Sequence, residues 1–404
     1  MKKYLVFAVV FCIISLWIVD YNLNKTNKKI SQPKVKQVIN EVKEDRYIFV
    51  SYIDYSKLLK GKTKEEQEKN IDEMVNNIHN ANYNVVILQI RPFADSIYHS
   101  SYFNTSSTVV SQEGDELVLD ILDYFIKKTH NFNMKLYAWI NPYRVRNVSD
   151  PTTISNKSVA YKWINTKNLE VIDNKGIFFN PSSKEVQKLI INGIDEVSKN
   201  YDIDGMLFDD YFYPNEEIDY LDYKEYVNKG GEYSLKKYHE EIINNLVKEA
   251  YQTVKKNNSN IMFGISPDGN IKNDYSVHHA DVKTWCKNDN YVDFIMPQVY
   301  YGFLHDTVPF ATTVEDWNDL IEKDNISLIP ALSLYKAGTK DMYAGSGENE
   351  WVENYDIIKR QIIYSRNLSH YSGFAIYRYD YYFNNLNYND TVMKETNNMK
   401  SLLK

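Results

Sequence analysis

The chain has 404 residues, of which 43% are hydrophobic and 25% are charged, so one large core is available and a globally disordered chain is excluded. Its formal net charge of −7 argues against nucleic-acid binding, because phosphate contacts need a clustered basic surface. There are two cysteines, Cys12 and Cys286, which excludes a disulfide framework. We expect Cys286 to be a packed residue rather than a nucleophile.

The first 43 residues differ from the rest of the chain. Lys2 and Lys3 precede an apolar run over residues 4–19, which is typical of an export signal. The run is slightly short for a membrane span, and no small-x-small cleavage site follows it. We expect residues 1–24 to be an uncleaved signal-anchor helix and residues 25–43 a polar linker, with a domain over 44–390 outside the membrane and a tail over 391–404. A cleaved signal peptide, which would give a secreted protein, is the alternative.

Eight short β-rich segments recur along the main domain, and most of them end in polar residues. They cover residues 46–52, 84–90, 135–140, 204–210, 261–267, 292–301, 327–332 and 373–380. Their near-continuous apolar character is typical of strands that are buried on both faces.

Segments of helical periodicity lie between these strands, over residues 64–81, 117–131, 185–201, 235–257 and 352–369. Alternating strands and helices indicate a parallel sheet. Eight repeats favour an α/β fold of the (β/α)8 TIM-barrel type, while an open doubly wound sheet is the alternative.

The run that begins at Asp204 ends in two adjacent carboxylates, Asp209 and Asp210, followed by Tyr211, Phe212 and Tyr213. Ligands bind at the carboxyl ends of parallel strands, and carboxylates beside aromatic rings suggest sugar chemistry. A strand followed by an Asp-rich helix cap is the structural alternative.

Competing chemistries lack their signatures. No Walker A loop or GxGxxG motif supports nucleotide binding, and the segment 264–269 lacks the GxSxG spacing of a serine hydrolase. His278, His279 and Asp281 are not accompanied by an HExxH motif or a Cys/His cluster, so we expect neither a metal nor another cofactor.

Seven ordered blocks resemble the bacterial glycosyl hydrolase-like family 10 over nearly the whole domain. They are Gln89-x-Arg91-Pro92-x-Ala94-Asp95-x-x-Tyr98, Ala138-Trp139-x-Asn141-Pro142-Tyr143-Arg144, Phe179-Asn180-Pro181, Asp204-Gly205-x-x-Phe208-Asp209-Asp210-Tyr211-Phe212-Tyr213-Pro214, Gly264-Ile265-Ser266-Pro267, Ala280-Asp281-x-x-x-Trp285 and Pro297-Gln298-x-Tyr300. The resemblance implies a (β/α)8 barrel and hydrolysis of cell-wall glycan, a peptidoglycan-like polysaccharide that contains N-acetylhexosamine. Residues 268–273 depart from the family pattern, which leaves the substrate contacts of that loop open.

Glycoside hydrolysis needs a protonated acid and a second group that attacks or stabilises the anomeric carbon. In one mechanism, an Asp of the pair is the acid and Asp95 is the nucleophile or base. In the other, Asp209 and Asp210 act alone, one orienting the substrate's N-acetyl group and the other donating the proton. Period-two alternation places Asp209 on the face of Leu207 and Asp210 on the other, which does not identify the acid. The pair should raise one carboxyl pKa in either case.

Polar and aromatic residues at other strand ends are the candidates for substrate binding: Arg91, Asn141, Tyr143, Tyr211, Gln298 and Tyr300. A different class of function also fits the sequence, namely a catalytically silent protein that binds glycan at the cell surface. The presence of both Asp209 and Asp210 favours the enzyme.

Overall fold

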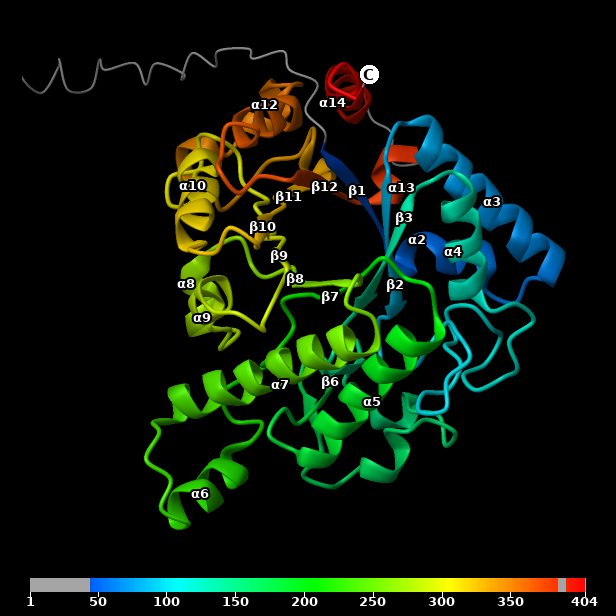
Figure 1. Ribbon diagram of the computed structural model, residues 1–404, viewed down its shortest axis with the longest axis vertical. Coiled ribbons are helices and arrows are strands. Elements are labelled where there is room, and N and C mark those ends of the chain that lie inside the picture. Colours follow the sequence, from blue (N-terminus) through cyan, green and yellow to red (C-terminus); the bar gives the residue numbers. More distant parts are fainter. Residues whose placement is uncertain (1–43, 384–389, 404) are drawn as a thin grey trace, which may run out of the picture. The chain divides into compact units, whose positions relative to one another are not determined.

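The computed structural model describes residues 44–383 and 390–403, and its centre is a curled parallel sheet of nine strands (Figure 1). In spatial order the strands are β10 (Ser327–Leu328), β9 (Phe294–Ile295), β8 (Met262–Ile265), β7 (Gly205–Phe208), β3 (Lys135–Ile140), β2 (Val85–Arg91), β1 (Asp45–Val50), β12 (Gly373–Tyr377) and β11 (Ala331–Ser333). Each of the eight predicted segments contributes to this sheet.

The two ends of the strand order meet in one extended segment. β10 and β11 are separated by only Ile329 and Pro330, and they pair with β9 and β12 respectively. Ala331 also bridges to Gln298 beyond β9, and its N–H donates to the carbonyl of Pro297 at 2.9 Å. The predicted seventh strand is therefore present as two short strands, one at each end of the strand order, and the two residues between them join those ends as a barrel requires.

Helices cover the outer face of the sheet (Figure 1). Three predicted helices appear with nearly unchanged bounds, as α3 (Lys64–Asn80), α5 (Lys184–Asn200) and α7 (Leu235–Asn257). The prediction over 117–131 began too early: α4 is Ile121–Asn131, because the carboxylate of Asp120 caps its first turn by accepting from the N–H of Asp123. The prediction of one continuous helix over 352–369 is wrong, because this range contains the end of α11 (Glu350–Glu353) and a separate helix, α12 (Ile357–Ser365).

Shorter helices complete the described part: α2 (Tyr52–Leu59), α6 (Tyr220–Asn228), α8 (Ile271–Ser276), α9 (Val282–Lys287), α10 (Phe310–Leu320), α13 (Tyr379–Phe383) and α14 (Asp390–Lys400). The segment predicted as a C-terminal tail contains most of α14, whose Val392 and Met399 are buried in the same core as the sheet and its helices. The predicted signal anchor and linker lie outside the described residues. Within the described ranges, no helix is both long and apolar enough to cross a membrane.

Alternate strand residues divide into two cores. The larger one lies between sheet and helices, and the smaller one fills the space enclosed by the strands, with Tyr47, Tyr137, Leu207 and Phe294 among its members. A Cβ at Gly205 would stand 2.5 Å from the ring of Tyr137, so only glycine leaves room for this aromatic filling.

Two insertions extend the barrel. Residues after β3 form an antiparallel sheet of β4 (Arg144–Arg146), β6 (Gly176–Phe179) and β5 (Leu169–Ile172). Between β7 and α7, the chain forms α6, which stands apart from the sheet (Figure 1). These insertions were not predicted from the sequence.

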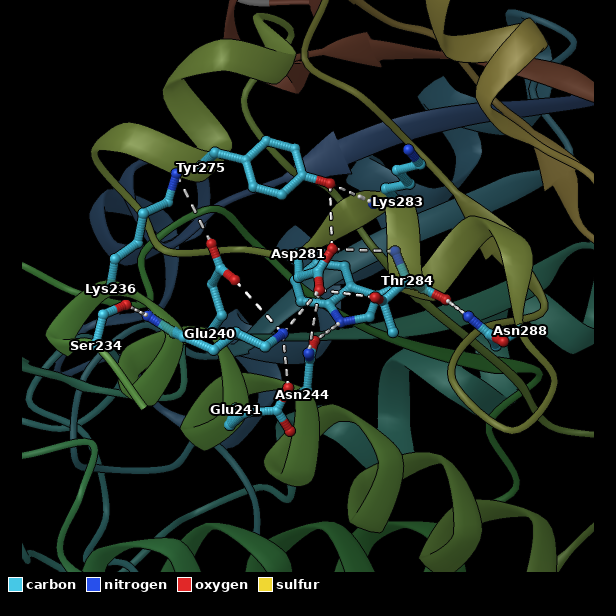
Figure 2. A network of polar contacts seen from close by, with 12 residues as sticks. Ser234, Lys236, Glu240, Glu241, Asn244, Tyr275, Asp281, Lys283, Thr284 and Asn288 are labelled. Carbon is cyan, nitrogen blue, oxygen red and sulfur yellow. Dashed lines mark hydrogen bonds and ion pairs between the residues drawn. The ribbon is translucent and has the colours of Figure 1, made fainter. Parts of the chain in front are cut away.

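Asp281 forms hydrogen bonds with residues of three helices, α7, α8 and α9 (Figure 2). It caps α9 by accepting from the N–H of Thr284 at 3.1 Å, and it also accepts from the Tyr275 hydroxyl of α8 at 3.1 Å and from Asn244 of α7 at 3.4 Å. The Nε1–H of Trp285 donates to Asn244 at 2.7 Å. The Asp281-x-x-x-Trp285 block therefore has a structural role, because it holds α7, α8 and α9 together.

Candidate active site

A cavity of about 300 Å³ lies at the carboxyl end of the sheet, and both members of the Asp pair line it. Strand β7 directs Leu207 into the enclosed core, and Asp209 follows on the same face at the point where the strand ends. The lining consists of the two Asp carboxylates, two other polar side chains and six aromatic rings: Asp209, Asp210, Ser266, Gln298, Phe49, Trp139, Tyr211, Tyr300, Tyr335 and Tyr377.

Asp209 is buried, and donors from β3 and the residues after it hold its side chain. Its Oδ2 accepts from the indole Nε1–H of Trp139 at 3.0 Å and from Nδ2 of Asn141 at 3.2 Å. From the residues that the structure describes, its Oδ1 accepts one long hydrogen bond, of 3.4 Å, from the N–H of Tyr211. Oδ1 is thus the oxygen left to accept a hydrogen bond from a ligand.

Asp210 is less buried and has fewer donors. Within the described residues, one side-chain hydrogen bond reaches it, from Nε2 of Gln298 to Oδ1 at 2.9 Å. Gln298 also donates to the carbonyl of Ser266 at 3.0 Å, which fixes its amide between the ends of β8 and β9.

Both carboxyl pKa values are raised. Burial, and then the charge of Asp210, raise the pKa of Asp209 to about 7, against the lowering effects of Arg144 and the Trp139 hydrogen bond. Burial also raises the pKa of Asp210, against the lowering effects of His278 and Gln298. Carboxyl groups with raised pKa values keep their proton to a higher pH than ordinary Asp side chains do, which is the property that acid catalysis requires.

Aromatic rings form the rest of the cavity wall. The ring of Tyr300 lies 5.9 Å from that of Tyr335 and 5.8 Å from that of Tyr377, while Tyr211 is 46% exposed at the rim. The guanidinium of Arg144 lies 5.0 Å from the ring centre of Tyr211, so this ring is held beside the carboxylates.

The structure brings several predicted site residues together in this place: Asp209, Asp210, Tyr211, Gln298 and Tyr300 line the cavity, and Asn141 contacts Asp209. Arg91 is not among them. The pairing of β2 with β3 shifts register between Gln89 and Arg91, and the guanidinium points away from the enclosed core, 4.1 Å from the ring centre of Phe103. A Cβ on Gly193 of α5 would strike it, which confirms that it packs between the sheet and a helix.

Asp95 and Tyr143 also lie away from the cavity lining. Asp95 is 2% exposed, its Oδ1 has no hydrogen-bond partner among the described residues, and burial raises its pKa to about 7 against the charge of Arg146. Tyr143 is fully buried in the outer core. Both side chains are enclosed by the surrounding protein, and neither lines the cavity that contains Asp209 and Asp210.

Sequence reasoning missed five of the lining residues as site candidates: Phe49, Trp139, Ser266, Tyr335 and Tyr377. Trp139 had a usable signal, since it shares a face with Tyr137 and stands one residue before the end of β3. Tyr335 had none, because it follows β11 in a short 3-10 helix (Leu334–Lys336) without periodicity.

The loop that departs from the family pattern lies beside Asp210. Asp268 accepts from the Tyr301 hydroxyl at 3.1 Å, and Nε2 of His278 lies 3.7 Å from its Oδ2. In the part of the chain that the structure describes, no three His, Cys, Asp or Glu side chains are grouped to hold a metal ion.

Comparisons with known proteins agree with this geometry. The chain is 27% identical over 337 residues to the glycosyl hydrolase YngK of Bacillus subtilis, covering 78% of this chain and 64% of YngK, so it spans less than two thirds of that protein. It is 25% identical over 346 residues to the glycosyl hydrolase DigH of Escherichia coli K12, covering 78% of this chain and 76% of DigH.

Solved structures share the fold. The PgaB (BpsB) glycoside hydrolase domain of Bordetella bronchiseptica superposes with a TM-score of 0.54 at 11% identity, covering 89% of this chain and 98% of that domain. An endo-1,4-β-mannanase of Rhizomucor miehei gives a TM-score of 0.55 at 11% identity, covering 89% and 94%. The model of the family glycosyl hydrolase-like 10 matches residues 41–351, and the chain belongs to this family.

Proposed function

We propose that the protein is a glycoside hydrolase that cleaves N-acetylhexosamine-containing cell-wall glycan, with Asp209 and Asp210 as the catalytic pair. One observation carries the proposal: two adjacent carboxylates with raised pKa values share an aromatic-walled cavity, but different donors hold them. Because their surroundings differ, the two carboxyl groups can have different roles, one as the proton donor and the other as the ionised carboxylate.

Asp209 is the member that we assign as the ionised carboxylate. Burial and the charge of Asp210 raise its pKa to about 7, but two N–H donors converge on its Oδ2 and stabilise the charged form, whereas one side-chain donor among the described residues reaches Asp210. Its Oδ1 would accept the N–H of the substrate's acetamido group, which makes the carbonyl oxygen of that group more nucleophilic. That oxygen forms a bond to the anomeric carbon as the glycosidic bond breaks.

Asp210 is the member that we assign as the proton donor. It is the more accessible of the two, and one donor on Oδ1 leaves Oδ2 to carry the proton. The proton passes to the leaving oxygen. Water then attacks the anomeric carbon, and Asp210 takes a proton from that water. The bond between the anomeric carbon and the acetamido oxygen breaks, which regenerates the acetamido group, and the two displacements together retain the anomeric configuration.

This assignment favours substrate assistance over an enzyme nucleophile. Asp95, the candidate nucleophile, lies outside the cavity lining and is enclosed by protein. Added azide should therefore not rescue Asp95→Ala as a glycosyl azide, whereas a thiazoline mimic of the cyclic intermediate should inhibit strongly. Azide rescue with formation of the glycosyl azide would instead identify Asp95 as the nucleophile.

Leaving-group chemistry tests the two roles. A substrate with a phenolate leaving group of low pKa needs little protonation, so Asp210→Asn should retain much of its activity on an aryl N-acetylhexosaminide while losing activity on glycan. Asp209→Asn should lose activity on both, because it acts on the attacking group. The opposite pattern would exchange the roles, and near-native activity of both variants on glycan would remove the pair from the mechanism.

We also propose that the enzyme acts outside the cytoplasmic membrane while attached through residues 4–19. The support is the sequence pattern of the first 43 residues and the family membership. Protease treatment of wall-stripped cells tests this, because an attached enzyme loses its barrel while its N-terminal segment stays in the membrane fraction. A soluble extracellular form that begins near residue 20 would show a cleaved signal peptide.

New reducing ends on purified glycan strands are the direct measure of hydrolysis. If the protein retains the strands and releases no reducing ends, the proposed activity fails and the protein is a glycan binder.

A further inference from the structure

The α6 insertion exposes aromatic and apolar side chains, although two of its tyrosines also pack inward: the rings of Tyr223 and Tyr226 lie 5.4 and 5.0 Å from that of Tyr238 in α7. Helix α6 has no fully buried residue, although its sequence contains Tyr220, Leu221, Tyr223, Tyr226 and Val227. Tyr220 is 46% exposed and Leu221 is 72% exposed. A surface helix normally buries an apolar stripe, and an exposed apolar group of this kind marks a binding surface.

The rings of the insertion are held in fixed positions. The Tyr223 hydroxyl donates to the carbonyl of Tyr233 at 3.1 Å, and the N–H of Tyr233 donates to the Tyr226 hydroxyl at 3.2 Å. The rings of Tyr226 and Tyr233 are stacked with centres 6.0 Å apart and planes 21° apart. We call Tyr220, Tyr223, Tyr226 and Tyr233 the tyrosine platform; Tyr220 is its exposed edge, and Nζ of Lys224 lies 4.4 Å from the centre of its ring. The fixed positions of Tyr223, Tyr226 and Tyr233 lower the entropy lost on binding.

A second cavity adjoins the platform. It has a volume of about 390 Å³, and hydroxyl, ammonium and carboxylate groups line it, among them Lys167, Ser182, Lys184 and Asp222. Asp222 belongs to α6 and accepts from Nζ of Lys167 at 2.7 Å. Because Asp222 and Tyr226 are four residues apart on the helix, cavity and platform share one face.

The insertion is also continuous with the catalytic cavity. Its chain leaves β7 through Tyr211, which lines that cavity, and is then anchored at Asp219. Asp219 is buried and accepts from the Tyr213 hydroxyl at 2.9 Å, and it pairs with Nε2 of His239 in α7 at 2.8 Å. The Asp281 network holds the same part of α7 (Figure 2). The platform thus stands on a rigid base that begins at the catalytic residues.

We propose that the α6 insertion is a second glycan-binding site, in which the tyrosine platform stacks against sugar rings and the adjoining cavity binds their hydroxyl groups. Tyrosine rings next to a polar cavity fit a polysaccharide better than an apolar protein surface, because sugar hydroxyl groups can hydrogen-bond to the Lys167–Asp222 ion pair and to the other polar groups of the lining. The inference rests on the proposed function, because the site would hold a polymer whose next segment reaches Asp209 and Asp210.

A double variant, Tyr220→Ser with Tyr233→Ser, tests the site, since both tyrosines are 46% exposed and their removal opens no cavity. Tyr355→Ser is the matched control: this tyrosine is 39% exposed and precedes α12, which Figure 1 shows far from α6. Binding is measured by cosedimentation with insoluble cell-wall glycan, with Asp210→Asn present in every protein to stop cleavage. Turnover of short soluble oligosaccharides is measured in proteins with Asp210 intact.

We expect the double variant to bind insoluble glycan about tenfold more weakly than the control, as the loss of two stacking contacts implies, with unchanged turnover of short oligosaccharides. Equal sedimentation of variant and control would overturn the proposal, and so would an equal loss of short-oligosaccharide turnover, which would make the platform part of the catalytic cavity. A concentration-dependent dimer that only the double variant loses, with glycan binding unchanged, would identify the surface as an interface between two copies. If no glycan is cleaved by the wild-type protein but sedimentation still depends on the two tyrosines, the proposed function fails and the second site stands.

Discussion

Replacing Trp139 by Phe isolates the hydrogen bond that we expect to keep Asp209 ionised. The change keeps an aromatic ring in the cavity wall but removes the Nε1–H that lies 3.0 Å from Oδ2 of Asp209. A hydrogen bond to a charged group contributes about 1.5–3 kcal/mol, and one pKa unit corresponds to about 1.4 kcal/mol. The pKa of Asp209 should therefore rise by about one to two units above its already raised value.

The consequence is a shift in the acid limb of the pH profile. Asp209 must be ionised to orient the acetamido group, so a higher pKa removes the active form at a higher pH. We expect the acid limb of kcat/KM, measured by release of reducing ends, to move up by about one to two units. Tyr137→Phe is the control, since Tyr137 lies in the same strand and faces the same core but does not contact Asp209. An unmoved limb, or a shift to lower pH, would refute the assignment of Asp209 as the ionised member.

Four further outcomes follow from the geometry. Gln298→Leu removes the donor to Oδ1 of Asp210, so the alkaline limb of kcat/KM should move to higher pH; an unchanged limb would show that Asp210 does not supply the proton. Asp95→Asn should stabilise the protein increasingly as the pH rises towards 7, because the folded-state pKa of Asp95 is raised and its ionised form opposes folding. Urea titrations at several pH values measure this, and a stability difference between variant and wild type that does not change with pH would contradict it. Asp281→Ala should lower the free energy of unfolding by about 1–3 kcal/mol, because the helix cap and the hydrogen bonds of Asp281 are lost. Those bonds lower the pKa of Asp281 despite its burial, so the difference between variant and wild type should shrink as the pH falls through the folded-state pKa. A loss of stability that persists in acid would contradict this. Gly205→Ala should cost about 1–3 kcal/mol by forcing a methyl group against Tyr137, and an unchanged thermal midpoint would mean that the core yields there.

The sheet was predictable because its signal is strong and repeated. Strands that are buried on both faces give continuous apolar runs, and all eight runs are strands. Helix ends were less predictable, since one polar side chain decides them: Asp120 delays α4 by capping it. The α6 insertion was not predictable, because a helix that buries nothing has no apolar stripe to detect.

The candidate site divides in the same way. Asp209, Asp210 and Gln298 follow strands directly, where position along the chain translates into position at the rim of the sheet. Arg91, predicted to bind substrate, lies outside the cavity for an identifiable reason: alternation from Val85 and Ile87 would carry its side chain into the enclosed core, and the register shift after Gln89 reverses it. A bulge of this kind has no signature in one sequence.

The filling of the enclosed core contributes to the raised pKa values of Asp209 and Asp210. Tyr137 and Phe294 occupy the space that Gly205 and Gly264 leave free, so aromatic rings fill the core around Leu207. Asp209 follows Leu207 on the same face and is 4% exposed, so burial raises its pKa, and the N–H donors of Trp139 and Asn141 stabilise its charge in place of bulk water. The glycines of β7 and β8 therefore influence the proposed chemistry through packing. They permit the aromatic core beneath the Asp pair, and burial against that core is the first cause of both raised pKa values.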